Sequence, residues 1–155
     1  MTVKEFLDYL SQELNRSPRT VISYAEDLYA FEAYFLDKDE GLTWETIDTD
    51  IIRDWMESMV DKGNSPSSVA RRLSAVKGFF KFALAREFIS SDPAHAIRSP
   101  KRSRPLPQFL KENEINDLLD KQAWGDDFKG LRDRLIIMMF YETGVRLAEL
   151  VGMDD

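Results

Sequence analysis

Apolar side chains recur every three or four residues along most of the chain, the spacing that places them on one side of an α-helix. Before residue 98 this pattern predicts four helices and one short turn, and no stretch there alternates with a period of two. We therefore expect an all-α fold in which four to five helices enclose one core. The expected segments are Val3–Leu14, Ser17–Lys38, Asp48–Lys62, Ser65–Glu87 and the turn Asp92–Ile97.

The fourth segment, Ser65–Glu87, is the most informative of these helices. Ser65 can cap its first turn and Pro66 suits the first helical position, as Ser17 and Pro18 do for the second helix. The side of this helix that lies opposite its apolar stripe carries small, hydroxylated and basic residues and no carboxylate. Gly78 lies on that side and leaves room for another molecule to come close. The apolar stripe should face the core through Val69, Leu73, Val76, Phe80, Ala83 and Leu84.

Charge is unevenly distributed along the chain. The net charge of −7 argues at first against a nucleic-acid partner. Residues 61–111, however, carry 11 basic and 3 acidic side chains, a net charge of +8, between segments of −9 (residues 1–60) and −6 (residues 112–155). Because a charged partner responds to the potential within about 10 Å at 0.1 M salt, this basic block matters more than the total.

A basic, hydroxyl-bearing helix face without acids suits the phosphates and edges of a DNA duplex. A merely solvated helix face is the alternative interpretation. On the second helix only the first turns fit such a role, because Glu26 and Asp27 follow. The predicted contacts with double-stranded DNA are Arg19, Thr20, Ser23, Ser67, Ser68, Arg71, Arg72, Ser74, Lys77, Lys81, Lys101, Arg102 and Arg104.

Residues 98–108, RSPKRSRPLPQ, are the clearest domain boundary, because three prolines exclude a helix and the basic residues offer no core. We expect a domain over residues 1–97, a basic linker over 98–108 and a second, helical part over 109–155. Helices are predicted at Phe109–Gln122, Leu131–Glu142 and Arg146–Met153. The run LIIMMFY is typical of a buried helix, yet little sequence follows to cover it. We therefore interpret residues 109–155 as the opening of a larger domain.

Composition excludes several classes of site. The chain has no cysteine and a single histidine, His95, so a disulfide, a thiolate metal site or a Ser-His pair is not expected. We predict no metal and no cofactor. The longest apolar run is far shorter than the roughly 18 residues that a membrane span needs, and a cytoplasmic protein is expected.

The stretch TGVRLAEL, residues 143–150, places Arg146 near a predicted helix start, with Glu149 three residues further on the same face. It resembles the first catalytic-arginine motif of the tyrosine recombinase (phage integrase) family, and most closely of its Xer-type members. The N-terminal half resembles that family's core-binding, SAM-like domain in the pattern from Ser17 to Leu28 and in the stretch from Ser68 to Ala75. These elements occur in the family's order over nearly the whole chain.

The resemblance implies site-specific DNA breakage and rejoining through a 3′-phosphotyrosyl link, without metal or nucleotide. It implies that Arg146 is the first of two arginines that stabilise the charge on the scissile phosphate, supported by Glu149. The family's other catalytic groups follow that arginine, so we expect this stretch of chain to bind DNA without cleaving it, and Tyr141 to be a core residue. Other recombinase protomers would be its protein partners on DNA, where the full-length family forms a tetramer.

Two other functions stay open at this point. One is a non-catalytic DNA-binding accessory protein, and the other is a helical protein-interaction module whose basic face meets an acidic partner. The target site, and whether the process is chromosome dimer resolution or integration of a mobile element, do not follow from the sequence.

Overall fold

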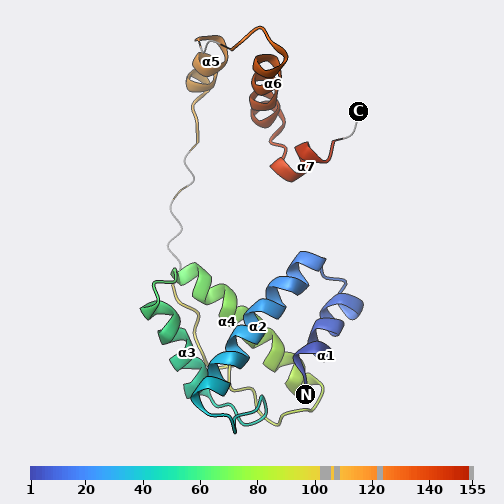
Figure 1. Ribbon diagram of the computed structural model, residues 1–155, viewed down its shortest axis with the longest axis vertical. Coiled ribbons are helices and arrows are strands. Elements are labelled where there is room, and N and C mark those ends of the chain that lie inside the picture. The colour runs from blue at the N-terminus through green and yellow to red at the C-terminus, as the bar shows by residue number, and fades with distance from the viewer. Residues whose placement is uncertain (102–105, 107–108, 122–123, 154–155) are drawn as a thin grey trace. The chain divides into compact units, whose positions relative to one another are not determined.

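The computed structural model describes every residue except 102–105, 107–108, 122–123 and 154–155. The chain divides into two compact units, Met1–Arg104 and Pro105–Asp155 (Figure 1). The division falls inside the proline-rich segment 98–108. The described residues form helices, turns and loops without a strand, which confirms the all-α prediction.

In the first unit, two helices each contact all the other α-helices. These are α2 (Pro18–Lys38) and α4 (Pro66–Ala85), which pack against each other and against α1 (Val3–Asp8) and α3 (Thr49–Asp61). Figure 1 shows α2 crossing α4, with α1 and α3 at either side. Nine residues of α4 are buried, so its predicted apolar stripe is the centre of the core.

The helix starts follow the predicted capping chemistry. The hydroxyl oxygen of Ser17 accepts a hydrogen bond from the Thr20 N–H at 3.2 Å. Ser65 does the same for the Ser68 N–H at 3.2 Å, and a Pro follows each of the two serines. A side-chain acceptor satisfies a backbone donor that the first helical turn leaves unpaired, which stabilises a start by about 1 kcal/mol.

Aromatic rings fill the core between these helices. The ring centroids of Trp44 and Phe79 are 4.4 Å apart, and those of Phe31 and Trp55 are 4.7 Å apart. Trp44 comes from the loop between α2 and α3, is 5% exposed, and donates its indole N–H to Glu32 at 2.7 Å. A lone tryptophan in a loop has no periodicity, so the sequence pattern did not place it in the core.

Two details differ from the predicted helices. The first helix is not α-helical throughout, because after α1 the chain widens into a π-helical turn, η1 (Tyr9–Glu13), and Asn15 adopts a positive φ of 47°. Leu84, predicted to be a core residue, is 41% exposed in the last turn of α4. Periodicity marks which side of a helix faces the core but not how far neighbouring elements extend along it.

The second unit contains α5 (Glu112–Lys121), α6 (Phe128–Thr143) and α7 (Leu147–Val151). α5 begins later than predicted, and Phe109 and Leu110 precede it as exposed, non-helical residues. Gly144 ends α6 in the left-handed conformation, at a φ of 63°. No residue of α6 is buried, and among the described residues of this unit only Ile115 is. The apolar run in α6 is therefore half-buried or exposed in this unit.

Within the described part of the chain, none of the helices combines the length and the hydrophobicity that a membrane span requires. The same residues bring together no group of three or more His, Cys, Asp or Glu side chains that could hold a metal ion. The expected absence of metal and cofactor, and the expected cytoplasmic location, stay predictions.

Substitution in the aromatic core should separate buried from exposed positions on one helix. Phe31→Ala should lower the free energy of unfolding by roughly 3–5 kcal/mol, because Phe31 is fully buried against Phe35, Trp44 and Trp55. Tyr29→Ala is the matched control, since Tyr29 is 48% exposed on the same helix. Urea unfolding followed by tryptophan fluorescence measures both variants. Equal losses would contradict the described core.

Candidate nucleic-acid interface

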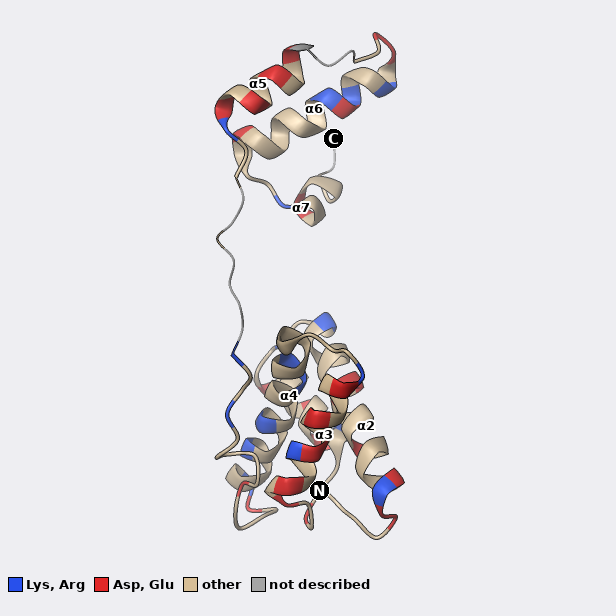
Figure 2. Ribbon diagram, turned by 90° about the vertical axis from the view of Figure 1, so that its left-hand side faces the viewer, with Lys and Arg blue, Asp and Glu red and all other residues tan. Residues whose placement is uncertain are grey.

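The outer side of α4 carries the basic face that its sequence predicts. The helix has four cationic and no acidic side chains, and Figure 2 shows basic residues along α4 and at the start of the linker, while acids mark α3. Arg71 and Lys81 are exposed, whereas Arg72 and Lys77 are half-buried. These four side chains differ in the hydrogen bonds and ion pairs that they already form within the unit.

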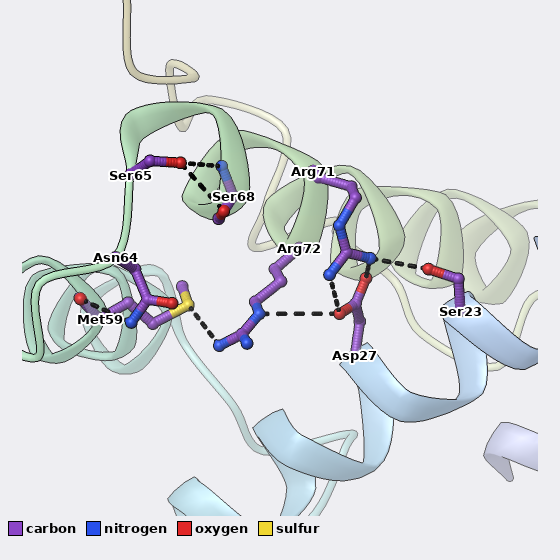
Figure 3. A network of polar contacts seen from close by, with 8 residues as sticks. All are labelled: Ser23, Asp27, Met59, Asn64, Ser65, Ser68, Arg71 and Arg72. Atoms are coloured by element: carbon purple, nitrogen blue, oxygen red, sulfur yellow. Dashed lines mark hydrogen bonds and ion pairs between the residues drawn. The ribbon is translucent and has the colours of Figure 1, made fainter. Parts of the chain in front are cut away.

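Arg71 is held by two side chains of α2 (Figure 3). Its Nη1 donates to Asp27 Oδ2 at 2.5 Å and to Ser23 Oγ at 2.8 Å, and its Nη2 donates to Asp27 Oδ1 at 3.0 Å. The guanidinium thus makes a two-point contact with one carboxylate and a third bond to a hydroxyl. Half of the Arg71 side chain, 51%, remains exposed.

Arg72 lies on the other side of the same carboxylate. Its Nε is 3.8 Å from Asp27 Oδ1, and its Nη1 lies 3.5 Å from the sulfur of Met59. The Asp27 side chain is 5% exposed, and Asp27 is the one buried charged residue of the described chain. Burial raises the pKa of Asp27 above its ordinary value, and the Arg71 and Arg72 guanidinium groups oppose that rise.

Sequence reasoning placed Asp27 on the outer face of α2, as an acid that would keep phosphates away. The structure buries it beneath two arginines of α4 instead. One signal was available: Asp27 directly precedes Leu28 and lies four residues before Phe31, both fully buried, so it flanks the apolar stripe of α2. The partner could not be read from α2 alone, because it comes from a helix 44 residues away.

The hydroxyl groups predicted to face DNA mostly serve the helices as well. Thr20 Oγ1 lies 2.9 Å from Ser17 Oγ, and Ser68 Oγ lies 3.0 Å from Ser65 Oγ, so the two Ser-Pro starts have the same geometry. Ser74 donates to the carbonyl of Ala70 at 2.8 Å. Among these hydroxyl groups, only that of Ser67 forms no hydrogen bond with a described residue.

Lys77 has a different partner from the one predicted. Its ammonium donates to the carbonyl of Ile97, where the chain leaves the helical domain and enters the linker. Half-buried Lys77 therefore anchors the start of that segment, and its contact with DNA stays a prediction.

Three predicted cations are exposed and form no ion pair with any described residue: Arg19, Lys81 and Lys101. They are the side chains most available to a phosphate, because no carboxylate of the described chain neutralises them. Arg102 and Arg104 lie outside the described residues.

The space beside Gly78 is occupied by other side chains of the same unit. A Cβ at this position would lie 3.4 Å from Cζ of Phe6 and 3.5 Å from Cε1 of Tyr24. The close approach inferred from the sequence is thus made by two aromatic rings of α1 and α2.

In the second unit, Arg146 and Glu149 form the predicted pair. One Glu149 oxygen accepts from the Arg146 backbone N–H at 2.8 Å, and the other accepts from Arg146 Nη1 at 2.9 Å. These two bonds lower the pKa of Glu149 below its ordinary value. The Arg146 side chain is 83% exposed, so its guanidinium is oriented by Glu149 and open to solvent.

Comparison with known proteins identifies the family of this chain. Residues 3–87 match the family described as phage integrase, N-terminal SAM-like domain. The match covers more than half of the chain, and the chain belongs to this family, as the sequence motifs predicted.

Similarity to named relatives extends beyond that domain. The chain is 39% identical over 150 residues to tyrosine recombinase XerC of Natranaerobius thermophilus, covering 97% of this chain and 50% of that protein. It is 36% identical over 152 residues to XerC of Mycobacterium sp. (strain KMS), covering 96% and 51%, and 28% identical over 152 residues to tyrosine recombinase XerD of Oceanobacillus iheyensis, covering 98% and 50%. The chain spans about half the length of these relatives, and the Xer-type resemblance is confirmed.

Replacement of Gly78 tests which molecule fills the space beside it. Gly78→Ala should raise the free energy of unfolding by up to about 1 kcal/mol, because alanine favours a helix interior over glycine and its methyl group would make near-ordinary contacts. Gly78→Leu should destabilise the unit by displacing Phe6. Thermal unfolding measures both variants, and duplex affinity of the alanine variant should be unchanged. A stable alanine variant with weakened duplex binding would show that DNA approaches here after all.

Removal of Arg71 should make stability depend on pH. In Arg71→Ala the burial of Asp27 is less opposed, so its pKa rises further above that of the unfolded chain. The folded state then binds a proton more tightly than the unfolded state, and the stability present below about pH 4 is lost as pH rises through the folded pKa. Urea unfolding at pH 4, 5.5 and 7 should show a growing deficit relative to wild type.

Arg71→Lys is the control for this deficit, because it keeps the charge beside Asp27. Its loss at neutral pH should be smaller, and for Arg71→Ala the loss should stay below the roughly 3–5 kcal/mol of a broken, fully buried pair, since Arg71 is half-exposed. A pH-independent deficit in Arg71→Ala would contradict the account.

Proposed function

We propose that the unit Met1–Arg104 binds duplex DNA through the start of α2 and the outer side of α4, within a protein that breaks and rejoins DNA strands at specific sites. The family match and the names of the relatives support recombination as the process. The observation that carries the DNA contact is α4 itself: a helix with four cations and no acid whose basic character continues into Arg98 and Lys101.

The exposed, unpaired cations are suited to phosphates. Arg19 lies in the first turn of α2 and Lys81 in the second half of α4, and Lys81 lines the same hollow as Thr20, the neighbour of Arg19. The N-termini of α2 and α4 add backbone N–H groups and a positive dipole end near Thr20 and Ser67, which also favour an anion. Each cation that neutralises a phosphate releases counterions, so binding should weaken steeply with salt.

The remaining predicted contacts divide by how firmly they are held. Lys101, Arg102 and Arg104 would extend the face along the linker, and Arg71 and Arg72 would offer donors at fixed positions. A wholly mobile set of lysines would give affinity with little preference, whereas fixed guanidinium groups can recognise acceptors by direction.

For the second unit we propose the role that the motif predicts. Arg146 would place its guanidinium on the scissile phosphate and stabilise the charge that develops there. The bonds from Glu149 to the backbone and side chain of Arg146 support this role, because they orient an otherwise exposed arginine. In a complete recombinase, other parts of the protein would supply the attacking tyrosine and the other catalytic groups. The reaction would need neither a metal ion nor a nucleotide. The protein would assemble with other protomers into a tetramer on the DNA, in the cytoplasm.

Charge reversal tests the proposed face. Arg19→Glu with Lys81→Glu should weaken binding of a fluorescently labelled duplex of about 30 base pairs by at least about tenfold at low salt, because two phosphate contacts become repulsive. Fluorescence anisotropy over a salt series measures both the affinity and its salt dependence.

Lys4→Glu with Lys38→Glu is the matched control. Both lysines are exposed, lie on α1 and at the far end of α2, and give the same change in net charge, although Lys38, unlike Arg19 and Lys81, pairs with a carboxylate, that of Asp54. This variant should bind within about threefold of wild type. Equal losses in both double variants would mean that only the total charge matters. No duplex binding by the wild-type chain would reject the proposal and favour a protein-interaction module.

A further inference from the structure

Asp27 is an unexpected residue to find beneath a DNA-binding face. Its side chain is 5% exposed and lies between Arg71 and Arg72, the two adjacent arginines of α4. An acid at this place lowers the positive charge that the face presents, since the three groups together carry +1 where the two arginines alone would carry +2. Electrostatic attraction to phosphates would therefore be stronger without Asp27.

The contacts of Arg71 show what the carboxylate contributes. Three of the five guanidinium N–H groups are engaged, two by Asp27 and one by Ser23. The Nε–H and the second N–H of Nη2 have no partner within the described part of the chain, and 51% of the side chain is exposed. An arginine held at one edge offers its remaining donors in a fixed direction.

The origin of these bonds makes the arrangement rigid. Ser23 and Asp27 are one helical turn apart on α2, and Arg71 reaches them from α4, to which α2 is packed. The guanidinium is thus fixed by both helices of the proposed face. A long, flexible side chain loses conformational entropy when it binds, and holding it in place beforehand reduces that loss.

We propose that Asp27 is a positioning residue that fixes the Arg71 guanidinium so that its two free N–H groups meet paired acceptors on the duplex in one register. This inference rests on the proposed DNA-binding function and adds to it that recognition at Arg71 depends on direction more than on charge. Ser23 assists as the second point of attachment. Arg72 shares the carboxylate but is only 33% exposed, so it neutralises Asp27 more than it reaches outward.

The proposal and simple electrostatics predict opposite signs for one substitution. Asp27→Asn removes a negative charge from the face, so attraction alone would tighten binding. If Asp27 positions Arg71, the same change should weaken binding, because the amide offers one acceptor in place of two. The probe is a duplex enriched from a random-sequence pool by the wild-type chain, with affinity measured by anisotropy.

We expect Asp27→Asn to weaken binding of this duplex about tenfold, with a salt dependence no shallower than that of wild type. Asp37→Asn is the matched control, because Asp37 is an exposed aspartate of the same helix and its loss gives the same change in charge. It should bind as well as wild type or slightly better. If Asp27→Asn tightens binding in the same way, the positioning role is wrong.

Arg71→Lys separates positioning from general structural support. It keeps the charge but cannot make the two-point contact, so it should weaken binding about as much as Asp27→Asn. The double variant should be no more than about twofold weaker than either single variant, since both remove the same contact. Additive losses would show that Asp27 acts through something other than Arg71, and would overturn the proposal.

Two further measurements keep the test decisive. If Asp27→Asn does not fold, Ser23→Ala provides the test, because it removes one of the three bonds to Arg71. This variant should bind the enriched duplex about threefold more weakly with its thermal midpoint preserved, and unchanged binding would count against the proposal.

In the free chain, ¹⁵N NMR should show slow rotation of the Arg71 guanidinium in wild type and fast rotation in Asp27→Asn. Fast rotation in wild type would reject fixation whether or not the chain binds DNA, while failure to enrich any duplex would reject the proposed function instead.

Discussion

Helix α4 packs against α1, α2 and α3, and nine of its residues are buried. A helix covered along so much of its surface keeps a limited strip for solvent, which carries Arg71 and Lys81, while Arg72 and Lys77 flank that strip as half-buried side chains. The same burial that stabilises the unit thereby gathers the basic side chains on one face. Gly78 fits this constraint, because the rings of Phe6 and Tyr24 lie where a side chain would project.

A buried carboxylate within such a face has a clear energetic cost. Removing Asp27 from water is unfavourable, and its raised pKa reflects that desolvation. Two guanidinium groups and the packing of α2 on α4 offset the cost, and the result is an arginine with three bonded and two free N–H groups. Replacing a buried ion pair by apolar packing is often neutral or stabilising, so we infer that this pair is valuable for its fixed geometry more than for its energy. The fixed Arg71 contrasts with Arg19 and Lys81, which are exposed and unpaired within the described chain.

The two units differ in how far each completes its own core. In the first, aromatic rings from α1, η1, α2, α3, α4 and the loop at Trp44 pack at centroid distances of 4.4–6.3 Å. In the second, α6 has no buried residue, although its sequence LIIMMFY is as apolar as a core helix. Apolar side chains of this kind favour burial by about 25 cal/mol per Å². Arg146 lies just beyond that helix, oriented by a carboxylate three residues away and otherwise exposed.

The sequence by itself determined that the fold is helical, the starts of three helices of the first unit, and the family. Ser17, Asp48 and Ser65 each cap the helix that the pattern predicted, because capping and periodicity depend on residues within a few positions of one another. The basic block and the TGVRLAEL motif are equally local, so the residues alone were enough to recognise them. The cationic residues could therefore be identified from the sequence. Which of them form ion pairs in the fold could not.

That distinction was decided by tertiary structure. Asp27 meets Arg71 across 44 residues, Lys77 meets the Ile97 carbonyl, and Trp44 enters the core from a loop. None of these contacts leaves a periodic trace, because each depends on how two separate segments are packed together. A helical pattern fixes the direction of a side chain around its own axis, whereas its partner is set by the neighbouring helix that the fold brings beside it.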